Sequence, residues 1–222
     1  MNSVVAPQPV RRVASEQTVL PAALASDDTR GRILEASLRL FAERGYAGTS
    51  IRDIAGAVGI QSATLYGHFP SKEHILAVLA EAGHEAHRRM LADALAGAGT
   101  DPADQLAALV RAHVMAHAEL AMLSIVANVE LHALSADLVG GSLAARSESE
   151  RLFTGAITRG IELGRFSTPD AWLAAAAIGG MGLRVAYWFG PGSSMSAETV
   201  ADTYVEFALR ILGAASPIRD PH

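Results

Sequence analysis

Four of the eight histidines in the sequence fall into two pairs whose spacing suits metal binding. His113 and His117 are four residues apart, which places two imidazoles on one face of a helix, and His84 and His87 are three residues apart. A zinc site needs a third protein ligand, and the sequence contains none of the histidine and glutamate strings that are typical of zinc proteases. We therefore interpret these histidines as lining a pocket or a surface, and we expect neither a metal nor a cofactor.

Covalent catalysis has one candidate string, GGSLA at residues 140–144. It resembles a nucleophile elbow, but it lacks the final glycine and no strand pattern precedes it. The chain also lacks a glycine loop of the kind that binds phosphates. Because there are no cysteines, disulfides and thiolate zinc sites are excluded. We do not expect an enzyme.

The stretch 51–70, IRDIAGAVGIQSATLYGHFP, has the spacing of a helix-turn-helix. Its fifth, ninth and fifteenth positions need a small residue at the helix crossing, a turn glycine and an apolar residue, and they hold Ala55, Gly59 and Leu65. The apolar residues repeat at helical spacing, which leaves polar side chains facing outward. An exposed helix that carries hydrogen-bond donors suits the major groove of DNA.

A longer string, GTSIRDIAGAVGIQSATLYGHFPSKEHIL at 48–76, resembles the DNA-binding domain of the TetR family of bacterial transcriptional regulators. The resemblance is specific over about residues 29–80 and holds in outline beyond them. Two positions depart from the family pattern: Ala63 is often glycine, and Gly67 is usually bulky or polar. The preferred operator therefore cannot be inferred from relatives. The matching residues are Thr49, Thr64-Leu65-Tyr66, His68-Phe69 and Ser71-Lys72-Glu73.

The outward positions and the resemblance together indicate which residues contact DNA. Gln61 and Thr64 are the best candidates for base edges, whereas Tyr66 and His68 are expected along the sugar-phosphate backbone. The full set expected at DNA is Thr49, Ser50, Arg52, Gln61, Ser62, Ala63, Thr64, Tyr66, His68 and Lys72.

Two of these residues have alternative roles. Thr49 or Ser50 is expected to cap the first helix of the motif, and the resemblance implies that an exposed hydroxyl at Thr49 also reaches a phosphate. Lys72, the only lysine in the chain, holds a phosphate by resemblance or is a solvated surface charge.

The expected fold is all-α, with an N-terminal three-helix helix-turn-helix DNA-binding domain and a C-terminal helical ligand-binding and dimerisation domain. The composition agrees, since half of the residues are apolar, only 5% are aromatic and alanine dominates. We expect a flexible arm at 1–26, the DNA-binding domain at 27–75, the second domain at 76–215 and a disordered tail at 216–222. Arg11 and Arg12 in the arm either touch the minor groove or belong to a disordered extension.

The net charge of −5 is unevenly distributed. Residues 1–75 hold eight basic and seven acidic side chains, whereas 76–222 hold ten and sixteen. DNA binding remains compatible with this balance because hydroxyls and helix N-termini also bind phosphates and a dimer doubles the contacts. The acidic, apolar second part argues against the alternative, a ligand-independent architectural DNA-binding protein, which would gain from a basic surface.

We expect a cytoplasmic protein that does not associate with a membrane. The N-terminus lacks a basic segment followed by a long apolar core, so no signal peptide is predicted. The longest uncharged apolar run, 171–183, is too short and too rich in glycine to span a bilayer.

The second domain is predicted to hold a ligand pocket, because polar groups are set among apolar residues there. The stretch 179–212, GGMGLRVAYWFGPGSSMSAETVADTYVEFALRIL, is similar to TetR-family regulators that respond to acyl-CoA thioesters of lipid or steroid breakdown, which implies such a thioester as the effector. The residues expected to contact it are His113, His117, Asn128, His132, Phe153, Met181, Arg184 and Trp188.

The last two helices, at about 170–190 and 196–213, predict a homodimer. Their apolar faces exceed what one domain needs, which favours a symmetric four-helix interface, as in the family; the alternative is burial of both helices within the monomer. The sequence therefore predicts a homodimeric, ligand-responsive repressor that binds a palindromic operator through the recognition helix 62–68.

Overall fold

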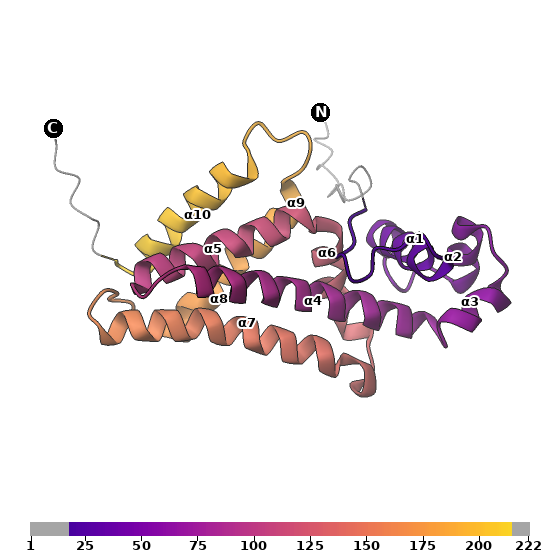
Figure 1. The fold of residues 1–222 in the computed structure, drawn as a ribbon, viewed down its shortest axis with the longest axis horizontal. Coiled ribbons are helices and arrows are strands. Elements are labelled where there is room, and N and C mark those ends of the chain that lie inside the picture. The colour runs from indigo at the N-terminus through magenta and orange to yellow at the C-terminus, as the bar shows by residue number, and fades with distance from the viewer. Residues whose placement is uncertain (1–17, 215–222) are drawn as a thin grey trace, which may run out of the picture.

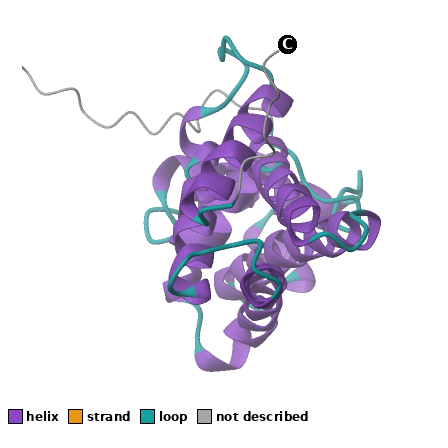
Figure 2. Ribbon diagram, turned by 90° about the vertical axis from the view of Figure 1, so that its left-hand side faces the viewer, coloured by secondary structure: helices purple, strands orange, loops and turns teal. Residues whose placement is uncertain are grey.

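The computed structural model describes residues 18–214, and every regular element in that part of the chain is a helix (Figures 1 and 2). Most of the predicted arm and all of the predicted tail, together with Arg11 and Arg12, lie outside the described residues. The all-α prediction is confirmed. The helices are α1 (Thr29–Arg44), α2 (Ile51–Val58), α3 (Ser62–His68), α4 (Lys72–Gly97), α5 (Pro102–Glu119), α6 (Ala121–Val129), the short 3-10 helix η2 (Leu131–Ala133), α7 (Ala136–Glu162), α8 (Ala171–Leu183), α9 (Val185–Trp188) and α10 (Ala197–Ile211).

Helices α1, α2 and α3 form a small head at one end of the molecule (Figure 1). Ser50 begins α2 with a capping box, in which its hydroxyl accepts from the backbone N–H of Asp53 and the Asp53 carboxylate accepts from the backbone N–H of Ser50. Gly59 ends α2 with φ of 75°, the left-handed conformation that the turn between α2 and α3 requires. These local signals are the ones that predicted the motif.

The end of the predicted arm is ordered against the head. Leu20 and Leu24 pack on the same apolar core as α1, and the Thr18 hydroxyl lies 3.7 Å from the sulfur of Met122 in α6. Leu20 and Leu24 thus bury apolar surface although they precede the first helix, and the flexibility of the arm stays a prediction.

Helix α4 belongs to both parts of the molecule. Its first turns place Ile75, Leu76 and Leu79 in the core of the head, and Leu91 lies in the core of the body. In Figure 1 it runs from the head along most of the body, beside α7. A single helix of this length is a stiff connection, since 26 residues rise by about 39 Å.

The body is a helical bundle in which α4 packs against α5, α6 and α7, and α5 also packs against α8 and α10. The predicted helix at 170–190 is broken: α8 ends at Leu183 and α9 begins at Val185. The GGSLA string lies inside α7, in helix rather than on a strand-to-helix turn, so it has none of the geometry of a nucleophile elbow.

No single helix among residues 18–214 is long and apolar enough to cross a membrane. Helices α5 and α6 meet the length and composition criteria only when they are taken together, and they are bent by 95° where they join.

Candidate DNA-binding surface and effector cavity

The exposed face of α3 carries the residues that were expected to meet base edges and backbone. Leu65 is fully buried, while Gln61, Thr64, Tyr66 and His68 are exposed, Tyr66 by 54%. Gln61 stands at the N-cap position without a capping hydrogen bond, so its amide is not used by the helix itself. Ala63 is exposed and Ser62 is half-buried on the same helix, and Arg52 is exposed on α2.

Two arginines of α1 hold the ends of the motif helices, and the sequence analysis missed both. Arg30 donates to the carbonyl of His68 at the end of α3 and stacks over the ring of Phe69, with the guanidinium carbon 4.3 Å from the ring centroid. Arg32 donates to the carbonyl of Val58 at the end of α2 at 2.6 Å. Cations suit helix C-termini, where carbonyls lack partners. No sequence signal pointed to them, because the partners are 26 and 38 residues away.

The expectation of an exposed hydroxyl at Thr49 is wrong. Thr49 is only 2% exposed, and its hydroxyl donates to the carbonyls of Leu40 and Gly45. The capping role belongs to Ser50 alone. Thr49 therefore fixes the loop before α2 and has no hydroxyl to offer to a phosphate.

Lys72 is held against the same loop. Its ammonium donates to the carbonyls of Tyr46 and Thr49, each at 2.7 Å, and lies 4.0 Å from the centroid of the Tyr46 ring. Burial lowers the pKa of Lys72. The alternative of a solvated surface charge is excluded, because two of the three ammonium protons are used within the head.

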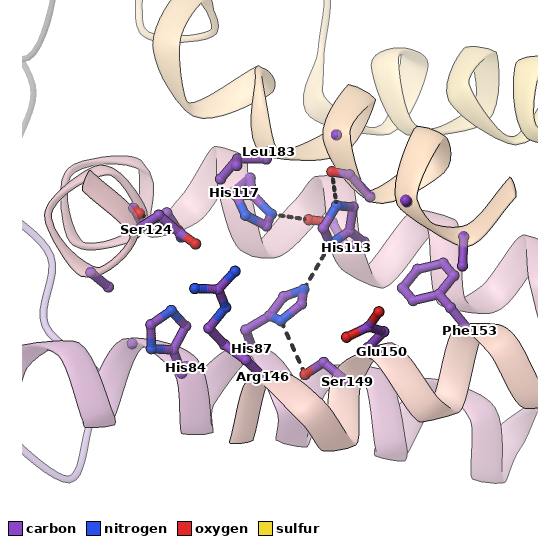
Figure 3. A pocket seen from close by; sticks show the side chains of 17 residues that line it. His84, His87, His113, His117, Ser124, Arg146, Ser149, Glu150, Phe153 and Leu183 are labelled. Carbon is purple, nitrogen blue, oxygen red and sulfur yellow. Dashed lines mark hydrogen bonds between the residues drawn. The ribbon is translucent and has the colours of Figure 1, made fainter. Parts of the chain in front are cut away.

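A cavity of about 320 Å³ opens in the body, between α4, α5, α6, α7 and α8 (Figure 3). Its size lies at the lower end of the range for small-molecule sites. Four of the predicted ligand contacts line it: His113, His117, Asn128 and Phe153. Lining residues outside the eight expected contacts include Gly83, His84, His87, Ser124, Arg146, Ser149, Glu150 and Gly179, and of these His84 and His87 were interpreted from their spacing as lining a pocket or a surface.

The other four predicted contacts do not line this cavity. His132 is exposed on η2, and Arg184 is exposed and lies over the ring of Tyr187. Met181 packs on the core of the body, and Trp188 packs edge-on against Phe189. The break between α8 and α9 at Arg184 changes the helical phase only for Trp188, which follows it, whereas Met181 lies before it in α8.

Three of the cavity histidines contact one another (Figure 3). The Nε2 atom of His87 lies 2.7 Å from Nδ1 of His113, and Nε2 of His113 lies 3.0 Å from the carbonyl oxygen of Gly179. The Nδ1 atom of His117 lies 2.7 Å from the carbonyl oxygen of His113, one helical turn earlier. His87 comes from α4, so the cluster joins two successive helices.

Burial keeps these imidazoles neutral. It lowers the pKa of His113 to about 3 and that of His84 to about 4, where the nearby positive charge of Arg146 adds to the effect. Burial also lowers the pKa of His87 and of His117. The cavity therefore presents uncharged rings at neutral pH, with Arg146 as a positive group in its wall.

His84 stands out among the lining residues. It is 5% exposed, and neither of its ring nitrogens makes a hydrogen bond of normal geometry, although Asn128 and the backbone of Ala80 are near enough to oppose the lowering of its pKa. Buried polar atoms are normally paired, so these nitrogens are available to a bound molecule. Histidine spacing placed His84 and His87 on one side of a helix, but only the packing of α4 on α5 and α7 shows that this side faces a cavity.

A helix-turn-helix head joined by one long helix to a helical body is the architecture of a transcriptional regulator. Residues 33–79 match the family of bacterial regulatory proteins, tetR family, and residues 99–212 match the tetracyclin repressor-like C-terminal domain. The chain belongs to the TetR family of bacterial transcriptional regulators, as the resemblance of 48–76 predicted.

Among its relatives is the HTH-type transcriptional repressor KstR2 of Rhodococcus jostii strain RHA1, which is 31% identical over 206 residues, or 86% of this chain and 97% of that protein. A regulatory protein of the tetR family from Rhodococcus RHA1 has a similar structure, with a TM-score of 0.79 and 30% identity, covering 88% of this chain and 100% of that one. AibR in complex with isovaleryl coenzyme A and operator DNA shares the fold, with a TM-score of 0.70 and 23% identity over 82% of this chain and 97% of that one.

Proposed function

We propose that the protein is a homodimeric, cytoplasmic transcriptional repressor that binds a palindromic operator through α3 and leaves it when a small molecule occupies the cavity. The observation that carries this proposal is the path of α4. Its N-terminal Lys72 is bonded to the loop before α2, and four turns later His84 and His87 line the cavity. A displacement of α4 by a ligand is thus transmitted to the head.

The exposed face of α3 supplies the contacts to DNA. Gln61 and Thr64 are placed to reach base edges in the major groove, while Tyr66 and His68 reach the flanking phosphates. Two such helices about 34–36 Å apart would enter successive major grooves of a palindrome. Ser50 and Arg52 lie at the start of α2, where they flank the same groove.

The homodimer would form through α8 and α10. Four large apolar side chains are exposed there in the single chain: Trp172 and Leu173 on α8, and Phe207 and Ile211 on α10, each by at least 40%. Burial of such side chains is favourable by about 25 cal/mol per Å², so a second copy covering them is the simplest way to remove them from water. Phe207→Glu is expected to yield monomers in sedimentation analysis, whereas Leu163→Glu, an equally exposed leucine at the end of α7, should leave the dimer intact.

The effector is proposed to be an acyl-CoA thioester. The cavity suits an acyl group rather than a whole coenzyme, so the nucleotide part would lie outside, past the exposed side chain of Arg146. The thioester class also has support from AibR, whose structure holds isovaleryl coenzyme A. One ring nitrogen of the neutral His84 would donate to the carbonyl oxygen of the thioester.

Release requires that the effector binds the two states of the dimer unequally. A ligand that fits a cavity with α4 displaced favours the dimer whose α3 helices have the wrong separation. To shift the dimer population from almost all in the operator-binding state to almost all in the released state, the effector must bind the released state more tightly by about 5.5 kcal/mol.

The test is a titration of the full chain against the intergenic DNA beside its own gene, at fixed salt, with and without a panel of acyl-CoA thioesters. Saturable, sequence-specific binding that one thioester releases would support both halves of the proposal. Specific binding that no thioester disturbs would remove the effector class. Binding that tolerates any sequence would instead favour the architectural alternative.

A further inference from the structure

Three histidine side chains lie side by side in the cavity, and neither DNA binding nor an organic effector requires this arrangement. His87 of α4 and His113 and His117 of α5 each offer one ring nitrogen as a ligand atom, and these three nitrogens lie within 4.8 Å of one another. His113 and His117 are about 95% buried. The sequence supplied two ligands at metal spacing, and the fold brings the third from another helix.

The hydrogen bonds determine which nitrogen of each α5 histidine carries a lone pair. A carbonyl oxygen only accepts, so Nε2 of His113 donates to Gly179 and Nδ1 of His113 holds the lone pair. By the same reasoning Nδ1 of His117 donates to the carbonyl of His113, which leaves the lone pair on Nε2 of His117. These two lone pairs, on Nδ1 of His113 and Nε2 of His117, are the ones that metal binding would use.

His87 can act as the third metal ligand while its other ring nitrogen keeps its hydrogen bond to Ser149. Its Nδ1 lies 3.4 Å from the hydroxyl of Ser149, and that hydroxyl donates its own hydrogen to the carbonyl of Ala145 at 3.0 Å, so it accepts from His87. In this tautomer Nε2 of His87 carries a lone pair that an ion could use. Without an ion, the hydrogen lies on Nε2 of His87, which donates to Nδ1 of His113 at 2.7 Å, and the ion would replace this hydrogen bond.

We propose that His87, His113 and His117 bind one divalent transition-metal ion of the zinc class, with the fourth coordination position open to the cavity. Three imidazoles and one exchangeable position are a common zinc arrangement. Each ligand is oriented from behind by an oxygen, those of Gly179, His113 and Ser149, which is the outer-shell pattern of histidine metal sites. Tetrahedral bonds of about 2.05 Å place the ligand nitrogens about 3.3 Å apart, so ring shifts of an ångström or so suffice.

The charged groups around the site determine what fills the fourth position. Glu150 accepts from the indole of Trp172 at 2.6 Å, which holds its carboxylate at the wall. The guanidinium of Arg146 faces the cavity beside His87 and His117 (Figure 3) and repels a bare divalent ion. The fourth ligand is therefore an anion, such as hydroxide or a carboxylate, which contacts the ion and Arg146 together.

Such an ion would join α4 to α5 at the cavity. Because His87 lies on the helix that enters the head, occupancy of the site would fix α4 against α5. The metal site itself does not rest on the proposed regulation by a thioester, since the ion binds to the protein alone.

The experiment uses the full chain without a polyhistidine tag, stripped with a chelator and then titrated with Co²⁺ and with Zn²⁺. We expect one ion per chain, visible absorption bands typical of four-coordinate Co²⁺, and displacement of Co²⁺ by Zn²⁺. His87→Gln and His117→Gln are each expected to weaken Zn²⁺ binding by more than about 100-fold, since outer-shell partners alone are worth about 10- to 100-fold.

His132→Gln is the matched control, because this histidine is exposed and lies outside the cavity. Its Zn²⁺ affinity should equal that of the unchanged chain. Ser149→Ala, which removes only the acceptor behind His87, is expected to weaken binding by about 10-fold and keeps the proposal testable if a histidine variant does not fold. Binding that is equal in His87→Gln and the unchanged chain, or that is lost in His132→Gln, overturns the site.

Azide tests the open position. It should change the Co²⁺ spectrum of the unchanged chain saturably, because a small anion replaces the fourth ligand beside Arg146. A spectrum of octahedral Co²⁺, or one that azide leaves unchanged, would contradict the proposed coordination. Neither result bears on operator binding, so the repressor assignment is tested separately.

Discussion

The DNA-binding face of α3 and the cavity of the body differ in how the chain builds them. The face is made of residues that lie within a single short helix, from Gln61 to His68, and their side chains are exposed. The cavity takes its lining from five helices, and its histidines are mostly buried. One is a local structure presented to solvent, whereas the other exists only after the bundle has packed.

This difference has consequences for stability. Exposed groups on α3 are free to change without loss of packing, because the helix is held from beneath by Leu65 and at its end by Arg30. Groups in the cavity wall also belong to the core, so a change there alters both binding and folding. Substitutions on the exposed face of α3 should therefore change operator binding alone, whereas substitutions in the cavity wall should change both ligand binding and stability.

The largest effect is expected from a matched pair of core leucines. Leu65→Ala in the head and Leu106→Ala in the body remove the same side chain from fully buried sites, and each should lower the free energy of unfolding by about 2–5 kcal/mol. Only Leu65→Ala should weaken operator binding by more than about 10-fold under conditions where both variants remain folded, because it supports α3. Chemical denaturation measures the free energy of unfolding, and fluorescence anisotropy with labelled operator DNA measures the affinity. Equal operator affinities of the two variants would show that operator binding does not depend on the packing of the head in particular.

Gly182→Ala tests the packing of the cavity wall. A Cβ at this position would collide with the ring of His113, so we expect a loss of about 1–3 kcal/mol in the free energy of unfolding and a displaced His113. Gly155→Ala is the control, since it lies in a helix with nothing near its added methyl, and it should be neutral or stabilising by up to about 1 kcal/mol. Equal melting curves for the two variants would mean that α8 does not pack closely on His113.

Lys72→Met distinguishes a structural lysine from a phosphate contact. Removing the ammonium takes one hydrogen bond from the carbonyl of Thr49 and one from that of Tyr46, which keeps the N–H of Thr49 as a donor. The loss should lower the free energy of unfolding by about 1–2 kcal/mol in the absence of DNA. The measurement is denaturation of the free protein. An unchanged stability with weaker operator binding would assign Lys72 to DNA alone.

Tyr66→Ala should give the smallest change in stability and a clear change in function. The side chain is 54% exposed, so the free energy of unfolding should shift by less than about 0.5 kcal/mol. Operator affinity should fall by about 10-fold, which corresponds to about 1.4 kcal/mol of lost contacts. A gel-shift titration that shows the same affinity as the unchanged chain would remove Tyr66 from the interface.

The sequence was informative wherever a structural signal is local. The small residue at Ala55, the turn glycine at Gly59 and the serine cap at Ser50 each act within a few residues, so the motif and its exposed face could be predicted from spacing. Thr49 was misjudged because a hydroxyl beside a cap is exposed or buried according to how the preceding loop folds back on α1.

The cavity could be predicted only in part. His113 and His117 were marked by their spacing, but His87 joins them only through the packing of α4 on α5, which no pattern in either helix specifies. Trp188 was placed by assuming one continuous helix, but it follows the break at Arg184, whereas Met181 lies within α8 and packs on the core of the body. Non-local packing, rather than helix formation, limits the prediction.

The measurement that tests the coupling of the two regions most directly is operator release in a pair of charge reversals on α7. Arg146→Glu changes an exposed residue of the cavity wall, and Arg159→Glu changes an exposed residue of the same helix that does not line the cavity. We predict that both variants bind the operator as the unchanged chain does, and that only Arg146→Glu fails to be released by the active thioester. The proposed coupling would be contradicted if the thioester released Arg146→Glu from the operator as it releases the unchanged chain. It would also be contradicted if Arg146→Glu failed to bind the operator in the absence of any thioester.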